Sequence, residues 1–589
     1  MKKGLALLIS AVAFGGIIST GLTSCGSVGT NTPIPEGQTI QDATIRINTH
    51  GDLVKVEIKE PKESYKAGDK IALTLTFKDG YGLHLATING KDIENVENIT
   101  LEEGANTIDI FVKSLTVTEG STNLRDFVFE ATDGGRSYAI TSYTPTGIYP
   151  NIVEIPSSYL GKPVTEIKFV TKEVINPDNS KDTIVVSRYL FGGLKGVKIP
   201  ASVKTIDTRI FRSNSTLQSI TVDEKNTAYS SDGKVLLSKD KKTLVAFAQG
   251  ISGEYKVPDT VTTIGNDAFY GTMKLTSVDF NNVTTIGNDA FNSVKGIKEF
   301  VLTDKITTLG ASAFSTCVET EKITLSNNLE TIPSNCFYKN SALKEITIPS
   351  SVKNIQDYAF YDCTSLQKFT MNEGLEEIGR CAVSHNLIET FTFPKTLRKI
   401  GEAAFAGNDR AKTVTLNEGL VEIGKSAFHR NLRITSILIP STVTTIGEEA
   451  FFAGLSLTEF NVRGENTKYS SKEGVLFDKA GTTLLAYPSA KVIENKTYVI
   501  PEGTTTLAYR CFSAVSNNPE GESAKPYSIT KIVIPTSVTS MNESFYLALL
   551  ETVEYKGTEA QFKAINFNGI VWNANASGTI KIVYSGDKQ

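Results

Sequence analysis

The sequence predicts a solenoid of stacked coils, each made of a strand and a short helical turn, preceded by a small all-β domain. Two observations predict the solenoid: an apolar residue, usually Phe, recurs every 22 or 23 residues, and a run of alternating apolar and polar residues precedes each copy. One unit of this length is too small to bury its own apolar side, so neighbouring units must stack. The recurring positions are Phe269, Phe291, Phe314, Phe337, Phe360, Val383, Phe405, Phe428 and Phe451.

Each repeat unit is interpreted as a strand, a turn and a short helical turn. In the run at residues 345–348 both isoleucines should point inward, with Glu and Thr outward, because side chains alternate along a strand. Pro349 ends the run because it has no N–H to donate to a neighbouring strand. Residues 288–291 then predict a short helical turn whose Phe points into the core. With neighbouring strands about 4.8 Å apart, the coils form a parallel sheet roughly 40 Å long. This is a leucine-rich-repeat architecture.

The repeat at residues 346–363 carries the fullest motif. It reads Ile-x-Ile-Pro-x-x-Val-x-x-Ile-x-x-x-Ala-Phe-x-x-Cys, with Gln356 where other copies have Gly. The pattern is similar to that of the BspA-like leucine-rich-repeat surface proteins of bacteria, and the resemblance covers residues 148–584. It implies attachment to the cell surface and, in some members, adhesion to host matrix proteins or other cells. It supplies no catalytic residue.

Residues 1–24 are predicted to be a signal peptide. Lys2 and Lys3 precede an almost wholly apolar stretch at residues 5–18, and residues 22–25 read Leu-Thr-Ser-Cys. This resembles the lipobox of bacterial lipoproteins, which implies a diacylglyceryl anchor on Cys25 and an extracytoplasmic location at the cell surface. Two acyl chains anchor a protein stably, whereas one is marginal. The alternative is an ordinary secretory signal that happens to contain a cysteine.

Further segments precede and follow the repeats. Residues 25–43 lack apolar periodicity and are interpreted as a flexible tether. Residues 44–115 contain several alternating runs and an Asn-Gly hairpin signal, which suit an immunoglobulin-like β-sandwich. Residues 116–196 are expected to form an N-terminal cap and the first degenerate repeats, and residues 549–589 a C-terminal cap in which Trp572 covers the last coil.

The solenoid itself is assigned to residues 197–548, with two insertions that match each other. Asn-Thr-x-Tyr-Ser-Ser occurs at residues 226–231 and again at residues 466–471, and two apolar runs follow each copy. Two such runs separated by four to six polar residues predict a β-hairpin. We expect hairpins near residues 223–257 and 463–500 to project from the edge of the solenoid.

Composition argues against several classes of function. A formal net charge of −4 gives no general reason to expect nucleic-acid binding. The four histidines are scattered, and the five cysteines after Cys25 lack the spacing of a zinc site or a disulfide framework. Their repeat positions fit buried free thiols instead. These cysteines are Cys317, Cys336, Cys363, Cys381 and Cys511. No enzyme activity, cofactor or metal is predicted.

A row of outward threonines is the candidate ligand face. Charged residues of alternating sign lie two positions earlier on several of the same coils, so the row is interpreted first as cross-strand pairs that support the sheet. A hydroxyl-rich face could also bind a glycan or an extended protein segment. The leading hypothesis is a non-catalytic adhesin that binds an extracellular protein or glycan. The alternatives are a structural envelope protein that gives spacing or shielding, and an enzyme or glycan-capture accessory. The threonines are Thr324, Thr347, Thr370, Thr392 and Thr415.

Overall fold

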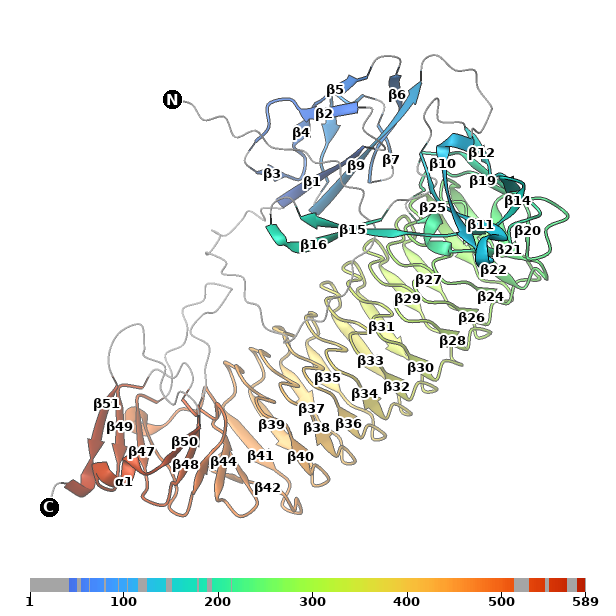
Figure 1. The fold of residues 1–589 in the computed structure, drawn as a ribbon. Coiled ribbons are helices and arrows are strands. Elements are labelled where there is room, and N and C mark those ends of the chain that lie inside the picture. The colour runs from blue at the N-terminus through green and yellow to red at the C-terminus, as the bar shows by residue number, and fades with distance from the viewer. Residues whose placement is uncertain are drawn as a thin grey trace, which may run out of the picture. The chain divides into compact units, whose positions relative to one another are not determined.

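The structure is a computed structural model (Figure 1). It describes residues 42–587 except for residues 50–53, 63, 79–80, 90, 94, 103, 115–123, 145–150, 177–178, 188–192, 213, 513–528, 546–549 and 569–579. The predicted signal peptide, Cys25, most of the predicted tether and Trp572 lie outside the described residues. The chain divides into two compact units, one of them running up to Ile297 and the other from Lys298 onward.

The first domain of the first unit is all-β in its described residues, as predicted. One sheet has the strand order β3-β1-β9-β6-β7, and β2 pairs with β5 and β4 with β8 in antiparallel fashion. Aliphatic side chains such as Val56, Leu73 and Ile108 form the core. The strands are β1 (Asp42–Thr49), β2 (Val54–Ile58), β3 (Tyr65–Lys66), β4 (Lys70–Ile71), β5 (Leu73–Phe77), β6 (Tyr81–Ile88), β7 (Lys91–Asp92), β8 (Ile99–Thr100) and β9 (Gly104–Ser114).

The next residues of the first unit open the solenoid. β11 pairs with β14 and β14 with β18, all in parallel, while β10 lies antiparallel on the outer edge of β11. Phe129 stacks on Tyr159 with ring centroids 3.9 Å apart, so aromatic rings cover the end of this core. The elements are η1 (Leu124–Asp126), β10 (Phe127–Thr132), η2 (Asp133–Gly135), β11 (Ser137–Tyr143), β12 (Ile152–Glu154), β13 (Ser158–Tyr159), β14 (Lys162–Ile167), β15 (Thr171–Asn176), β16 (Asn179–Ser187), β17 (Gly196–Ile199), β18 (Thr205–Ile206), η3 (Thr208–Phe211) and β19 (Ser219–Val222).

The first unit then holds the first insertion and two regular coils. β21 pairs with β20 and β22 in antiparallel fashion, β22 pairs with β24 in parallel, and β24 pairs with β26 in parallel. Val235, Leu236 and Leu237 of β21 are buried. The predicted hairpin is present as β21 and β22, but the expectation that it projects from the edge is wrong, because its apolar side chains join the core. The strands are β20 (Tyr229–Ser231), β21 (Val235–Ser238), β22 (Thr243–Phe247), β23 (Gly253–Lys256), β24 (Thr263–Ile264), β25 (Leu275–Asp279) and β26 (Thr285–Ile286).

In the second unit each regular coil carries two strands, which Figure 1 shows as successive rungs. The longer strands include the predicted alternating runs: β27 (Glu299–Val301), β29 (Lys322–Thr324), β31 (Glu345–Ile348), β33 (Lys368–Met371), β35 (Thr390–Thr392), β37 (Thr413–Thr415), β39 (Ser436–Ile439) and β41 (Glu459–Val462). Short strands end at the residue that matches Ile355 of the Val-x-x-Ile segment in the motif: β28 (Thr308–Leu309), β30 (Thr331–Ile332), β32 (Asn354–Ile355), β34 (Glu377–Ile378), β36 (Lys399–Ile400), β38 (Glu422–Ile423) and β40 (Thr445–Ile446). The parallel solenoid predicted from the period is confirmed.

The predicted short helical turns are wrong for the regular coils, whose described residues form turns and no helix. Asn335 and Lys339, which flank Phe337, both have a left-handed φ of 57°. Left-handed residues interrupt a helix and turn alternate amides along the solenoid. The amide of Phe337 donates to Ala359 O of the next coil at 2.8 Å, whereas that of Tyr338 donates to Asn335 O within the turn. The turns therefore form a hydrogen-bonded ladder of their own.

The second insertion and the closing coils complete the second unit. α1 begins with a capping box made by Thr558 and Gln561, and its buried Phe562 packs on Tyr555 and Tyr584. The elements are β42 (Tyr469–Lys472), β43 (Val475–Asp478), β44 (Thr483–Ala486), η4 (Glu494–Lys496), β45 (Thr497–Val499), β46 (Thr506–Leu507), β47 (Lys531–Ile534), β48 (Ser540–Asn542), β49 (Thr552–Tyr555), α1 (Glu559–Lys563), β50 (Asn566–Asn568), β51 (Lys581–Tyr584) and η5 (Ser585–Asp587).

Candidate functional site

The predicted threonine row lies on the outward side of the long strands in the second unit. Four of its side chains are exposed, and that of Thr370 is half-buried. Thr347 pairs with Thr370, and Thr392 with Thr415. Lys322 pairs with Glu345, which places Thr324 beside Thr347 two residues further along. The row is nevertheless split, because β27-β29-β31-β33 and β35-β37 are separate sheets.

Ion pairs flank this row. Lys322 Nζ lies 2.7 Å from a carboxylate oxygen of Glu299, and Lys368 Nζ lies 3.8 Å from one of Glu345. The hydrogen bond to Glu299 raises the pKa of Lys322. All four side chains are about half exposed or more, and such surface pairs contribute about 0–1 kcal/mol. The predicted cross-strand pairing is therefore present, and it leaves the face with hydroxyl groups and charges that neutralise one another.

The tyrosines of the two insertions are tied to the coils before them. The hydroxyl oxygen of Tyr229 accepts a hydrogen bond from the amide of Ile206 at 3.1 Å, and that of Tyr469 accepts one from Ile446 at 2.8 Å. Burial raises the pKa of both phenols. In both insertions the tyrosine hydroxyl therefore holds the insertion against the preceding coil.

The five cysteines of the repeats are buried free thiols, as predicted. Burial raises the pKa of Cys363 to about 12 and also raises the pKa of Cys336 and Cys511. Thiolate is the reactive form of cysteine. The thiols therefore serve as small apolar side chains between coils.

Two of the scattered histidines lie at the turns of two coils that are separated by one other coil. His385 packs against Tyr361 with centroids 5.2 Å apart, and His429 stacks on Phe452 at 5.1 Å. Gly407, which has a φ of +69°, lies so close to His385 that a Cβ there would be 2.9 Å from Nδ1. Burial, helped by the nearby charge of Arg430, lowers the pKa of His429 to about 4. Both imidazoles therefore act as packed, neutral rings near neutral pH.

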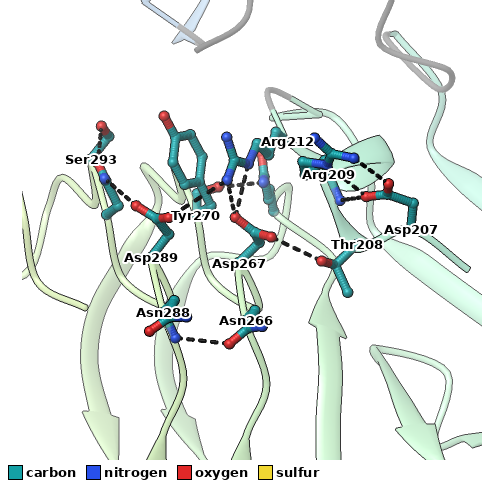
Figure 2. A network of polar contacts seen from close by, with 12 residues as sticks. Asp207, Thr208, Arg209, Arg212, Asn266, Asp267, Tyr270, Asn288, Asp289 and Ser293 are labelled. Carbon is teal, nitrogen blue, oxygen red and sulfur yellow. Dashed lines mark hydrogen bonds and ion pairs between the residues drawn. The ribbon is translucent and has the colours of Figure 1, made fainter. Parts of the chain in front are cut away.

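A polar network in the first unit was missed by sequence reasoning (Figure 2). Arg212 Nε donates to Asp267 Oδ1 at 2.9 Å, and its guanidinium lies 4.1 Å from the ring centroid of Tyr270. Thr208 Oγ1 donates to Asp267 Oδ2 at 2.9 Å. Asp289 lies 3.9 Å from the same guanidinium, and burial raises its pKa. The network joins the turn before the first insertion to the two turns after it. Its only signal in the sequence is an Arg directly after one repeat Phe and an Asp two before the next.

A counterpart occurs at the second insertion. Arg510 donates to Glu449 at 2.7 Å and to Glu543 at 3.4 Å, and its guanidinium lies 4.8 Å from the ring centroid of Tyr509. The charges are placed in the reverse order, since the acid comes from the turn before the insertion and the arginine from the turn after it. Each insertion is therefore spanned by an arginine–carboxylate pair.

The described residues contain no group of three or more His, Cys, Asp or Glu side chains that could hold a metal ion. Two pairs of adjacent carboxylates, at residues 376–377 at the start of β34 and at residues 448–449 in a turn, do not belong to such a group. Among the helices of the described residues, none has the length and apolar character needed to cross a membrane.

Comparison with known proteins identifies the repeats. The family model described as "BspA type Leucine rich repeat region" matches six copies, over residues 173–232, 245–365 and 330–458. A leucine-rich repeat protein from Bacteroides ovatus is 20% identical, with 79% of this chain and all of that chain covered and a TM-score of 0.44. A leucine rich cell surface protein from Faecalibacterium prausnitzii is 19% identical, with 77% and 98% covered and a TM-score of 0.37. The pneumococcal vaccine antigen PcpA is 16% identical, with 80% and 99% covered and a TM-score of 0.36. No curated protein matches the chain.

Proposed function

This chain belongs to the family of BspA-type leucine-rich repeat proteins, and from that premise we propose that it is a non-catalytic binding protein displayed at a bacterial cell surface. Its ligand is an extracellular protein or glycan, and the binding face is the outward side of β29, β31, β33, β35 and β37. The observation that carries the proposal is the row of exposed threonine hydroxyls on that face.

The chemistry of the row suits a neutral or mixed polar ligand. Each hydroxyl can donate one hydrogen bond and accept two, so it adapts to sugar hydroxyls or to a peptide backbone. The flanking Lys and Glu side chains neutralise one another and give no field of a single sign. Specificity would then come from hydrogen bonds and shape.

The anchor is proposed from sequence alone. Cys25 carries a diacylglyceryl group in this proposal, and residues 25–43 hold the folded part away from the membrane. The proposal predicts a lipid-anchored protein on the outer face of the cell envelope.

The ion pairs favour a second candidate function. Cross-strand charge pairs support a sheet without any ligand, and an array held together in this way could serve as a structural envelope protein that gives spacing or shielding. A glycan-capture accessory role is the form that the binding proposal takes if a glycan proves to be the ligand.

A triple substitution separates these functions. Replacement of Thr347, Thr370 and Thr392 by Lys places three charges without partners against the ligand, so binding to cells or glycan arrays should be lost. Melting should be nearly unchanged, because surface changes usually cost within about 0.5 kcal/mol each. The matched control replaces by Lys three exposed threonines that directly precede the short strands β40, β46 and β48: Thr444, Thr505 and Thr539. Binding that survives the first triple change excludes this face, and a collapse of melting shows that the row supports the sheet.

A further inference from the structure

The two insertions occupy equivalent places in their coils but differ at one buried position. Phe247 N donates to Ala268 O, and Tyr487 N donates to Cys511 O, both at 2.8 Å. In each insertion this aromatic residue therefore takes the ladder position that the repeat Phe has in a regular coil. Two residues later the first insertion has Gln249 and the second has Ser489.

A regular turn carries three amides that donate to the next coil. They belong to the repeat apolar residue and to the residues two before and two after it. In the last such turn before the second insertion, Ser426 N donates to Glu448 O, Phe428 N to Ala450 O and Arg430 N to Phe452 O, at 2.7 to 2.9 Å. The same three bonds occur for the turn of each repeat residue between Phe314 and Phe428: Phe314, Phe337, Phe360, Val383, Phe405 and Phe428.

This ladder ends at the second insertion. The next three donors are the amides of Glu449, Phe451 and Ala453, and they meet no backbone carbonyl of the described residues. Phe451 is 8% exposed and Ala453 2%. Donors buried in this way need an acceptor, because a buried amide without one is destabilising.

The first insertion bridges the corresponding gap with a side chain, which meets the amide three residues after the repeat Phe of the preceding turn. The side-chain oxygen of Gln249 accepts from Asn214 N at 2.9 Å, and its Nε2 donates to Tyr270 O at 2.5 Å. Gln249 is 2% exposed. A carboxamide can do both because it combines an acceptor oxygen with two donor hydrogens. One side chain thus links the turn before the insertion to the turn after it.

The second insertion has a cavity in the corresponding region. The side chain of Ser489 is shorter than that of Gln249, and among the described residues its hydroxyl donates only to Gly454 O, on the turn before the insertion. A cavity of about 210 Å³ is bordered by the turn with the three amides and, among others, by Tyr487, Ser489 and Arg510. It reaches the core, since Phe451 is 8% exposed whereas Phe428, one coil earlier, is 1% exposed.

Charge around the cavity decides which acceptor is suitable. Glu448 and Glu449 border it, and Glu543 lies 3.4 Å from Arg510. With three carboxylates and one guanidinium, the side chains around the cavity carry a net negative charge, which disfavours an anionic ligand. A neutral ligand with a carbonyl oxygen satisfies the amides without that repulsion.

We propose that the cavity at the second insertion binds a small neutral ligand through an amide group, which takes the place that the Gln249 carboxamide fills at the first insertion. The amide carbonyl accepts from the amide of Gly454, which lies three residues after Phe451 as Asn214 lies three after Phe211, and from the neighbouring amides of Phe451 and Ala453. The group can come from the acetamido substituent of an N-acetylated amino sugar or from a glutamine side chain. This site is independent of the threonine face.

Binding is tested on the mature chain with two probes and their matched controls. N-acetylglucosamine is compared with glucose, and an end-blocked Gly-Gln-Gly peptide with Gly-Glu-Gly. We expect at least one amide probe to bind and to slow hydrogen exchange at Gly454 and at its neighbours Phe451 and Ala453, while neither control does so. The amide probe that binds identifies the source of the group. Failure of both amide probes at millimolar concentration overturns the proposal, as does slowed exchange confined to other residues.

Two substitutions test the equivalence of the insertions. Ser489→Gln should fill the cavity with the chain's own carboxamide and weaken probe binding at least about tenfold, which corresponds to 1.4 kcal/mol. Ser489→Ala leaves the cavity open and should bind within about threefold of the parent, a difference below 1 kcal/mol. Binding by a folded Ser489→Gln variant at parental strength overturns the proposal. If that variant does not fold, the exchange measurement on the parent chain still decides.

Discussion

The rings of Phe337 and Phe360 stack with their centroids 5.1 Å apart and their planes inclined by 18°. Both side chains are fully buried. The same stacking links Phe269 to Phe291 in the first unit and Phe405 to Phe428 in the second. The repeat Phe is therefore both the core residue of its own coil and the contact to its neighbour.

Phe360→Ala should cost about 3–5 kcal/mol, because it removes a buried ring and leaves a cavity between two coils. In a quasi-one-dimensional array the loss of protection should stay near the altered coil. Hydrogen exchange measures both the size and the spread of the effect. Thr347→Ala, on the outward face, is the control and should change little. Loss of protection across the whole second unit, or no change at all, contradicts this account.

His429 should make stability depend on pH. Its pKa is lowered from 6.5 to about 4 in the folded chain, mainly by burial. Between these two pKa values the unfolded chain therefore binds more protons than the folded chain. The contribution of neutral His429 to the free energy of unfolding is complete above pH 6.5 and is lost as the pH falls towards 4. One pKa unit is about 1.4 kcal/mol, so the full effect is on the order of 3 kcal/mol.

Chemical denaturation at pH 7 and pH 4.5 measures this dependence. His429→Phe keeps an aromatic ring over Phe452 but cannot take up a proton, so the pH-dependent loss should shrink in that variant. An equal loss in the parent and in His429→Phe would assign the pH dependence to other groups. His385, whose pKa burial also lowers, titrates in the same direction.

The Arg212–Asp267 pair should couple the turns on either side of the first insertion. Their side chains are 17% and 8% exposed. Asp267→Asn keeps the side-chain shape and tolerates the left-handed φ of 60°, but it should cost about 2–3 kcal/mol because it removes the charge that Arg212 faces.

A double-mutant cycle of Asp267→Asn with Arg212→Met measures the coupling, which should be about 1–3 kcal/mol. The exposed pair Lys412–Glu389, joined at 3.2 Å, is the matched comparison and should give less than about 1 kcal/mol. Equal coupling energies for the two pairs would refute a special role for the Arg212 network.

Cys25 should alone decide where the protein is found. Cys25→Ala removes the predicted site of the diacylglyceryl group, and the two acyl chains are the anchor. The variant should therefore be a folded, soluble and secreted protein, whereas the parent partitions with membranes on fractionation. A variant that still sediments with membranes would refute the prediction that the protein is a lipoprotein.

Sequence reasoning went furthest where a property repeats in every coil. The 22–23-residue period identified the core positions, and Phe314, Phe337 and Phe360 are fully buried as expected. The placement of the cysteines followed in the same way, because a position in the repeat fixes which side of the coil a side chain faces. The second strand of each coil was not predicted, since the recurring Val-x-x-Ile segment is too short to show the alternation of a strand. The left-handed turns were not predicted, since non-glycine left-handed residues leave no pattern of their own.

By itself the sequence determined the solenoid, its core and the place of both insertions, because these depend on periodicity along the chain. Only the tertiary structure decided the arginine–carboxylate pairs and the cavity at Ser489. Arg212 and Asp267 are 55 residues apart, and the partner of a turn amide belongs to the next coil. Which side chains and amides meet at an insertion depends on how the coils before and after it stack. The local sequence pattern carries no information about that stacking.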